Sequence, residues 1–158
     1  MFPLERLARL ARRRPLLVAG ALSGTSADGV SVAVVRIRGA GPGARVQLLR
    51  FGTRPYPRAV RAALLRAPSL EASEIARLSL DVAGAFVRAV RSVAGRGAGL
   101  DLVGSHGQTV FHGGSGGTLQ IGEADGIAEG LRVPVVSDFR QRDIAAGGEG
   151  APLTPYAD

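Results

Sequence analysis

Three short polar segments carry the residue types best suited to chemistry, and the first is Ser23–Gly29, which reads Ser-Gly-Thr-Ser-Ala-Asp-Gly. Backbone N–H groups and hydroxyls in such a turn can bind an anion, and we expect Gly24 and Gly29 to adopt positive φ angles. Asp28 would repel a phosphate unless it held Mg²⁺, directly or through water. A polar hairpin turn without a ligand has the same composition, so the segment alone leaves both interpretations open.

The second segment, Gly104–Thr109, follows a short apolar run and reads Gly-Ser-His-Gly-Gln-Thr. We predict a loop that offers Ser105, His106 and Gln108 as donors and acceptors at the carboxyl end of a strand, where open α/β sheets place ligands. A histidine at a strand end is also compatible with a purely structural role. Because Ser105 and His106 are adjacent, their side chains diverge, and the segment does not indicate a hydrolase triad.

The third segment, Asp138–Asp143, alternates acidic and basic residues and runs into the glycine-rich stretch 145–152. Its arginines could form a fork for a carboxylate or a phosphate, or they could belong to a solvated cluster of ion pairs. All three segments follow predicted strands. We therefore predict that they form one shared polar ligand site.

Composition removes several classes of chemistry. With 158 residues, of which 46% are hydrophobic, the chain is long enough for one globular domain. It has no cysteine, which excludes a thiolate nucleophile or a disulfide scaffold and favours a reducing compartment, the cytoplasm. All 20 basic residues are arginine, so neither a P-loop lysine nor a Schiff-base lysine is available. No apolar run is long enough to suggest a membrane partner.

The net charge of +7 is concentrated at one end of the chain. Residues 1–15 hold five arginines and one glutamate, which gives +4, whereas the other 143 residues hold 15 arginines and 12 acids, which gives +3. With only seven aromatic residues (5 Phe, 2 Tyr) for base stacking, we expect no nucleic-acid partner. We interpret residues 1–15 as a basic N-terminal extension, and residues 16–158 as one lobe.

Hydrophobic periodicity predicts an α/β architecture that positions these segments. Strands are expected over residues 16–22, 30–38, 45–52, 100–105, 118–121 and 133–137. Helices are expected over residues 58–67, 71–94 and 123–130, with Ser69 as a cap of the long one. The first three strands should form an antiparallel meander. Because Pro134 is unfavourable inside a strand, we predict a mixed sheet of about five strands flanked by helices.

Four motifs, in their order and spacing, resemble the anhydro-N-acetylmuramic acid kinase family. They are Leu-Ser-Gly-Thr-Ser-Ala-Asp-Gly (22–29), Gly-Ser-His-Gly-Gln-Thr (104–109), Thr-Leu-Gln-Ile-Gly (118–122) and Val-Ser-Asp-Phe-Arg (136–140), the last running into Ala-Ala-Gly-Gly-Glu-Gly-Ala-Pro-Leu (145–153). The resemblance implies the sugar kinase, Hsp70 and actin superfamily, in which two ribonuclease-H-like lobes bind ATP between them. The predicted order of elements fits the N-terminal lobe. Gln141 and Glu149 stand where the family pattern leads us to expect arginine and glutamine.

The resemblance also implies an activity, which is ATP-dependent phosphorylation of 1,6-anhydro-N-acetylmuramic acid with opening of the anhydro ring. The product is N-acetylmuramic acid 6-phosphate, in peptidoglycan recycling. Carried over by position, the ATP-binding residues would be Ser23, Gly24, Thr25, Ser26, Asp28 and Gly29, with Asp28 near Mg²⁺. The sugar-binding residues would be Ser105, His106, Gln108 and Arg142, with Arg142 pairing with the lactyl carboxylate.

The family's catalytic base is expected beyond Asp158, in a C-terminal lobe that would be this chain's missing partner. We therefore expect the isolated chain to be inactive, and we assign no catalytic residue within it. The alternative interpretation is a half-lobe that binds a ligand or a partner without catalysis. The sequence leaves a homodimer open.

Overall fold

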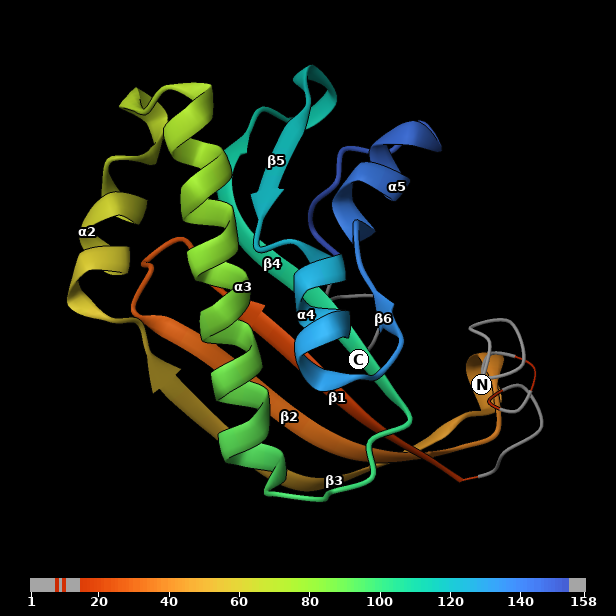
Figure 1. Cartoon of the computed structure of the whole chain (residues 1–158). Coiled ribbons are helices and arrows are strands. Elements are labelled where there is room, and N and C mark those ends of the chain that lie inside the picture. The colour runs from red at the N-terminus through yellow and green to blue at the C-terminus, as the bar shows by residue number, and fades with distance from the viewer. Residues whose placement is uncertain (1–7, 9, 11–14, 154–158) are drawn as a thin grey trace.

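The computed structural model describes residues 8, 10 and 15–153. The basic extension predicted for residues 1–15 therefore lies almost entirely outside the described residues, as do residues 154–158. The described chain forms a six-stranded mixed sheet with a 23-residue helix packed across one face (Figure 1). None of the described helices is long and apolar enough to cross a membrane.

Three antiparallel strands open the fold, as predicted: β1 (Leu16–Ser23), β2 (Gly29–Arg38) and β3 (Arg45–Pro55). On the other side of β1 lies β4 (Leu102–His112), which runs parallel to it. β5 (Thr118–Ile121) pairs antiparallel with β4, and the short β6 (Val135–Val136) pairs parallel with it. The strand order is β3-β2-β1-β4-β5, with β6 also on β4. A meander followed by a helix and a strand parallel to β1 is the arrangement of a ribonuclease-H-like lobe.

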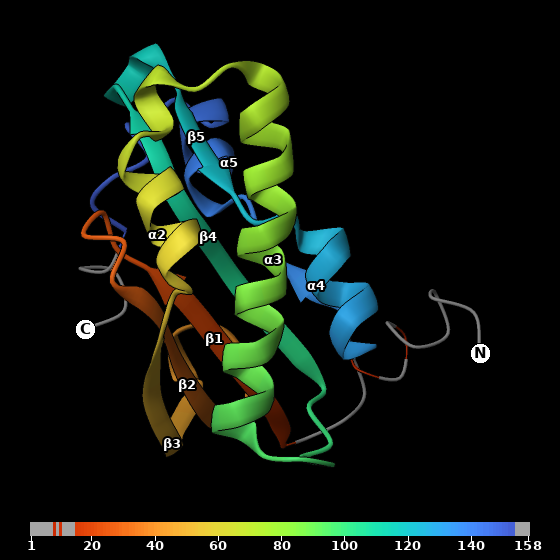
Figure 2. The ribbon, with the colours of Figure 1, turned by 60° about the vertical axis from the view of Figure 1, so that its left-hand side comes forward.

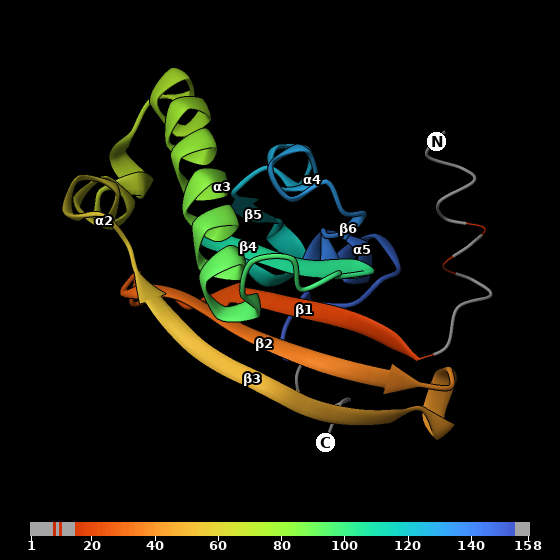
Figure 3. The same cartoon turned by 60° about the horizontal axis from the view of Figure 1, so that its bottom comes forward.

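Four helices complete the described fold: α2 (Arg58–Leu65), α3 (Ala72–Ala94), α4 (Ala124–Leu131) and α5 (Phe139–Ala145). α3 crosses one face of the sheet, with α2 and α4 on either side of it (Figure 2). Its apolar stripe, centred on the fully buried Phe86, packs against Val30 and Val32 of β2. None of the helices α2 to α5 lies over the opposite face of β2 and β3, where Phe51 is 67% exposed (Figure 3).

β4 differs from the prediction, because it continues to His112 instead of ending at Ser105. The segment predicted as a loop is thus part of a strand, with a bulge. Ala21 pairs with Ser105 while Ser23 pairs with Gln108, so β4 holds one extra residue between these pairs. Gly107 permits the bulge, since its φ is 70° and a Cβ there would lie 2.8 Å from the Ile121 carbonyl oxygen.

Three smaller predictions also need correction. The cap of α3 is Glu71, whose N–H donates to the Glu74 carboxylate at 2.9 Å, whereas the Ser69 hydroxyl donates to the Arg66 carbonyl. Pro134 does not interrupt a strand, because β6 begins one residue later. Residues 139–145, for which no helix was predicted, form α5.

Candidate functional site

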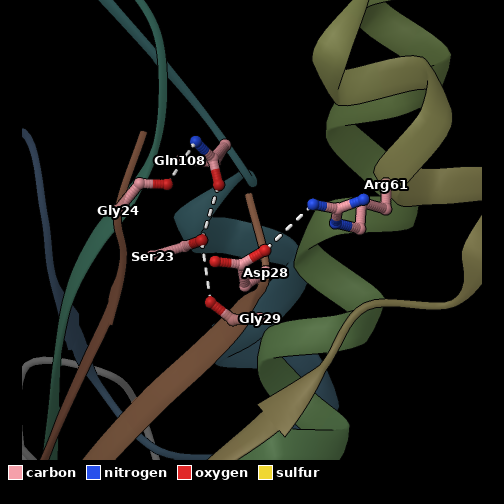
Figure 4. Close-up of polar contacts among 6 residues, drawn as sticks. All are labelled: Ser23, Gly24, Asp28, Gly29, Arg61 and Gln108. Atoms are coloured by element: carbon pink, nitrogen blue, oxygen red, sulfur yellow. Dashed lines mark hydrogen bonds and ion pairs between the residues drawn. The ribbon is translucent and has the colours of Figure 1, made fainter. Parts of the chain in front are cut away.

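The turn between β1 and β2 is tied to β4 through two buried side chains (Figure 4). The Ser23 hydroxyl, at the end of β1, lies 2.9 Å from the Gly29 carbonyl oxygen and 2.5 Å from Oε1 of Gln108. Because a serine hydroxyl carries one hydrogen, it can donate to only one of these oxygens at a time. Both Ser23 and Gln108 are 2% exposed, so this contact is shielded from water.

The amide of Gln108 is used entirely within the chain. Its Nε2 donates to the carbonyl oxygens of Gly24 and Thr109, each at 3.1 Å. Its Oε1 also lies 3.4 Å from the hydroxyl of Tyr56, whose pKa is raised to about 12 by burial. The bulge in β4 thus places Gln108 where it holds the start of the turn, and its buried amide is not presented to a ligand in this structure.

The turn itself exposes the residues expected to meet a phosphate. Thr25, Ser26 and Asp28 are exposed, and the turn closes with a hydrogen bond from Ala27 N to the Gly24 carbonyl at 3.1 Å. The expectation of positive φ at Gly24 and Gly29 is wrong, because the left-handed residue is Ala27, at φ 51°. Gly29 is needed for a different reason, since a Cβ there would lie 2.3 Å from the Arg54 carbonyl oxygen on β3.

Asp28 forms an ion pair with Arg61 of α2, with Oδ1 and Nη2 3.0 Å apart (Figure 4). The pKa of Asp28 is lowered by a hydrogen bond from the Ser26 side chain and by Arg61, so the carboxylate is charged at neutral pH. Among the described residues, no group of three or more histidines and carboxylates could hold a metal unaided. A Mg²⁺ ion would therefore need phosphate oxygens and water beside Asp28, which is how Mg²⁺ usually binds with nucleotides.

His106, in the bulge of β4, is held by the third polar segment. Its Nε2 accepts a hydrogen bond from Nε of Arg140 on α5 at 2.8 Å, and its Nδ1 lies 3.2 Å from the Gly107 carbonyl oxygen. Since Nε2 is the acceptor, the neutral imidazole carries its hydrogen on Nδ1. Burial and, to a smaller extent, the Arg140 charge lower the pKa of His106.

Arg140 also holds the glycine-rich loop that follows α5. Its Nη1 donates to the Gly150 carbonyl at 2.8 Å, while the Gly150 N–H donates to Oδ2 of Asp143 at 2.8 Å. The three polar segments are therefore linked in series: the turn contacts β4 through Ser23 and Gln108, and β4 contacts α5 through His106 and Arg140.

A pocket of about 200 Å³ lies between the β4 bulge and the start of α4. Ser105 and Gln120 line it, and within the described part of the chain their Oγ and Oε1 atoms are buried without a hydrogen-bond partner. Three carboxylates line it as well, those of Glu123, Asp125 and Asp138, and no arginine does. This pocket is rich in acceptors, so it favours ligand groups that donate hydrogen bonds, such as hydroxyls and amide N–H groups.

Of the predicted sugar-binding residues, Ser105 and His106 line this pocket, and Gln108 and Arg142 do not. Arg142 lies on α5 with its side chain exposed. At the two positions that depart from the family pattern, Glu149 is exposed, and Oε1 of Gln141 is buried without a partner among the described residues.

Sequence reasoning missed two arginines of this region. Arg61 lies 33 positions from Asp28 on a separate helix, so no local spacing connects the two residues. Arg140 belongs to a segment that the sequence singled out, but nothing there distinguished it from Arg142. Arg140 is 34 positions from His106 in the sequence. The two residues come into contact because β6 pairs parallel with β4, which brings α5 beside the bulge.

Comparison with known proteins identifies the family of the chain. The sequence pattern of the family described as anhydro-N-acetylmuramic acid kinase matches residues 16–158. The chain belongs to this family. Proteins named anhydro-N-acetylmuramic acid kinase from Bacillus cereus (strain Q1) and from a Picosynechococcus species are each 40% identical to it, over 156 and 148 residues. One from Bacillus anthracis is also 40% identical over 156 residues.

The matches cover most of this chain and less than half of each relative. The Bacillus cereus protein is matched over 90% of this chain and 41% of its own length, and the Picosynechococcus protein over 89% and 39%. This chain thus corresponds to an N-terminal portion of an anhydro-N-acetylmuramic acid kinase, in agreement with the predicted family.

Proposed function

We propose that this chain is the N-terminal lobe of a sugar kinase that phosphorylates 1,6-anhydro-N-acetylmuramic acid with ATP and opens the anhydro ring, to give N-acetylmuramic acid 6-phosphate. The observation that carries the proposal is the series of contacts that links the turn 23–29, the β4 bulge and α5 in a chain of this family. Relatives of this name are more than twice as long, so the proposal includes a C-terminal lobe that completes the site. Its compartment would be the cytoplasm.

The turn 23–29 is the proposed contact for the phosphates of ATP. Thr25 and Ser26 present hydroxyls at an exposed tip, while Ser23 and Gln108 hold the base of the turn from below. In the absence of lysine, these hydroxyls and the turn backbone supply the donors. A turn that is held in place before binding loses little conformational entropy when the nucleotide arrives.

Asp28 is the proposed contact for Mg²⁺. Its carboxylate is exposed and ionised, and its partners in this structure are the Ser26 side chain and the guanidinium of Arg61. When bound, ATP would supply the phosphoryl group, and Mg²⁺ would neutralise phosphate charge. Arg61 would then leave Asp28 for a phosphate oxygen or contact both groups, since the Asp28 carboxylate and the phosphate are both anions.

The 200 Å³ pocket is the proposed contact for the sugar. The unpartnered acceptors of Ser105 and Gln120, with the three carboxylates, suit the hydroxyl and acetamido N–H donors of an amino sugar. The lactyl carboxylate would be disfavoured beside these acids. The exposed Arg142, outside the pocket lining, is the proposed partner for it.

Phosphoryl transfer tests the proposal. We expect the chain alone to release no ADP above background with ATP·Mg and 1,6-anhydro-N-acetylmuramic acid. We expect transfer when the chain is fused to the C-terminal portion of the Bacillus cereus relative, with the intact relative as a positive control. A fusion that folds and binds ATP·Mg but transfers no phosphoryl group would overturn the proposed activity.

The second candidate is a binding module without catalysis, favoured by the share of the relatives that this chain spans. Calorimetric titration separates the two candidates. If the module interpretation is right, the sugar binds to the chain, and the fusion remains inactive.

A further inference from the structure

A second and larger pocket lies at the opposite end of the sheet from the turn 23–29, and the proposed function does not use it. It has a volume of about 900 Å³ and is formed by the last turns of α3, the connection 95–100 and the end of α4. In Figure 1 these segments meet at the lower end of α3, whereas α5 and β5 lie at the other end. Ligand pockets commonly have volumes of about 300 to 1,000 Å³.

The lining of this pocket carries positive charge only. Four arginines contribute to it, and no aspartate or glutamate does. Arg88 and Arg91 come from α3, Arg96 from the connection, and Arg132 from the residue that ends α4 in the left-handed conformation. Four arginines from three separate elements thus line one space, and we call it the arginine pocket.

Helix ends do not account for all of this charge. The carbonyl groups at the ends of α3 and α4 carry partial negative charge and attract cations. Two arginines already donate hydrogen bonds to carbonyl groups at these helix ends: Arg50 donates to the Ala94 carbonyl and Arg91 to the Gly130 carbonyl. The side chains of Arg88, Arg96 and Arg132 form no hydrogen bond or ion pair with the described residues. Their charge is available to a ligand.

The rest of the lining is mainly apolar. Ala98, Leu100 and Leu131 contribute partly exposed side chains to it, whereas Val90, Ala94 and Val133, which also line it, are buried. An apolar surface beside three unpaired guanidinium groups fits a ligand with both characters. We propose that the arginine pocket binds an amphipathic organic anion, with an apolar or aromatic body and a phosphate, sulfonate or carboxylate group.

The probe for the test is 1-anilinonaphthalene-8-sulfonate, an aromatic sulfonate that fluoresces on binding, with the uncharged N-phenyl-1-naphthylamine as its neutral counterpart. We expect the sulfonate to bind more tightly than the neutral compound. Arg88→Gln and Arg96→Gln should each weaken sulfonate binding by about fivefold to tenfold, since each removes a charge-assisted hydrogen bond. Arg96→Lys should recover part of the loss.

Arg45→Gln is the matched control, because it removes one positive charge beside the exposed apolar residues Val46 and Leu48 of β3. It should leave the affinity within about twofold, as only nonspecific attraction would change. If Arg45→Gln weakens binding as much as the pocket variants do, or if the pocket variants bind unchanged, the proposal is wrong. The far-ultraviolet circular dichroism and urea midpoint of each variant show whether it is folded. Failure of ATP to bind at the turn 23–29 would not affect this result.

Discussion

The Ser23 hydroxyl oxygen lies 2.5 Å from Oε1 of Gln108, although the two residues are 85 positions apart in the sequence. This contact joins the end of β1 to the bulge of β4, and the same amide holds the Gly24 carbonyl. The turn proposed to bind phosphate is therefore supported from the neighbouring strand by a side chain without access to solvent. Gln108 is in this sense a positioning residue for the turn.

Replacing Gln108 by leucine should destabilise the fold and loosen the turn. The substitution leaves the Gly24 and Thr109 carbonyl oxygens without their side-chain donor, while the Ser23 hydroxyl can still donate to the Gly29 carbonyl. This loss should lower the free energy of unfolding by about 2 to 3 kcal/mol. Urea denaturation measures this. Gln47→Leu is the control, since Gln47 is an exposed strand residue and should change stability by less than about 0.5 kcal/mol. Equal effects of the two substitutions would contradict the role given to Gln108.

Two strand glycines should respond in opposite ways to alanine. At Gly29 a Cβ would lie 2.3 Å from the Arg54 carbonyl oxygen, so β2 and β3 must separate. We expect Gly29→Ala to cost at least about 2 kcal/mol of stability. At Gly20 no atom lies within 4 Å of the Cβ position, and Gly20→Ala should be neutral or stabilising by up to about 1 kcal/mol. Thermal unfolding of both variants checks this, and a tolerated Gly29→Ala would show that the close approach is not a constraint.

His106 should make stability depend on pH. Its pKa is lowered in the folded chain from the ordinary 6.5, so the unfolded chain binds the proton more tightly. The contribution is fully present above pH 6.5 and is lost as pH falls below that value toward the folded pKa. His106→Gln should flatten this part of the stability profile. An imidazole NMR titration that places His106 at or above 6.5 would contradict the contact from Arg140.

The pKa of Asp28 should rise when either of its two hydrogen-bond donors, Ser26 or Arg61, is removed. The Ser26 side chain is the larger cause of the lowered pKa, and Arg61 is the next. We expect Ser26→Ala and Arg61→Gln each to raise the Asp28 pKa, with Arg77→Gln, an exposed arginine of α3, as an unchanged control. Carboxyl carbon NMR titration gives all three values. An Asp28 pKa that is unchanged in both Ser26→Ala and Arg61→Gln would contradict these two contacts.

The scaffold could be predicted from the sequence because its signals are local. Val30, Val32 and Val34 alternate with half-buried neighbours as a strand requires, and α3 carries its apolar stripe at helical spacing around Phe86. The family motifs identified the fold class and the family correctly. The length of β4 was not predictable in the same way, because a bulge at Gly107 depends on pairing with β1.

The residue types of the candidate site could be predicted from the sequence, but their geometry could not. Gln108 reads as an exposed ligand contact in sequence, but the bulge turns it into the core beside Ser23. The contacts of Arg61 and Arg140 could not be predicted from their own segments, because their partners, Asp28 and His106, belong to other elements. Long-range contacts of this kind come from the strand order, which local periodicity does not determine.

The most direct test of the central claim is a ¹⁵N NMR titration of the chain with ATP, with and without Mg²⁺. We predict amide shift changes centred on residues 24–28, dependent on Mg²⁺ and strongly reduced in Asp28→Asn. Changes confined to the arginine pocket, or no change at the turn at ATP concentrations that saturate a full-length relative, would contradict the assignment of this turn as the nucleotide contact.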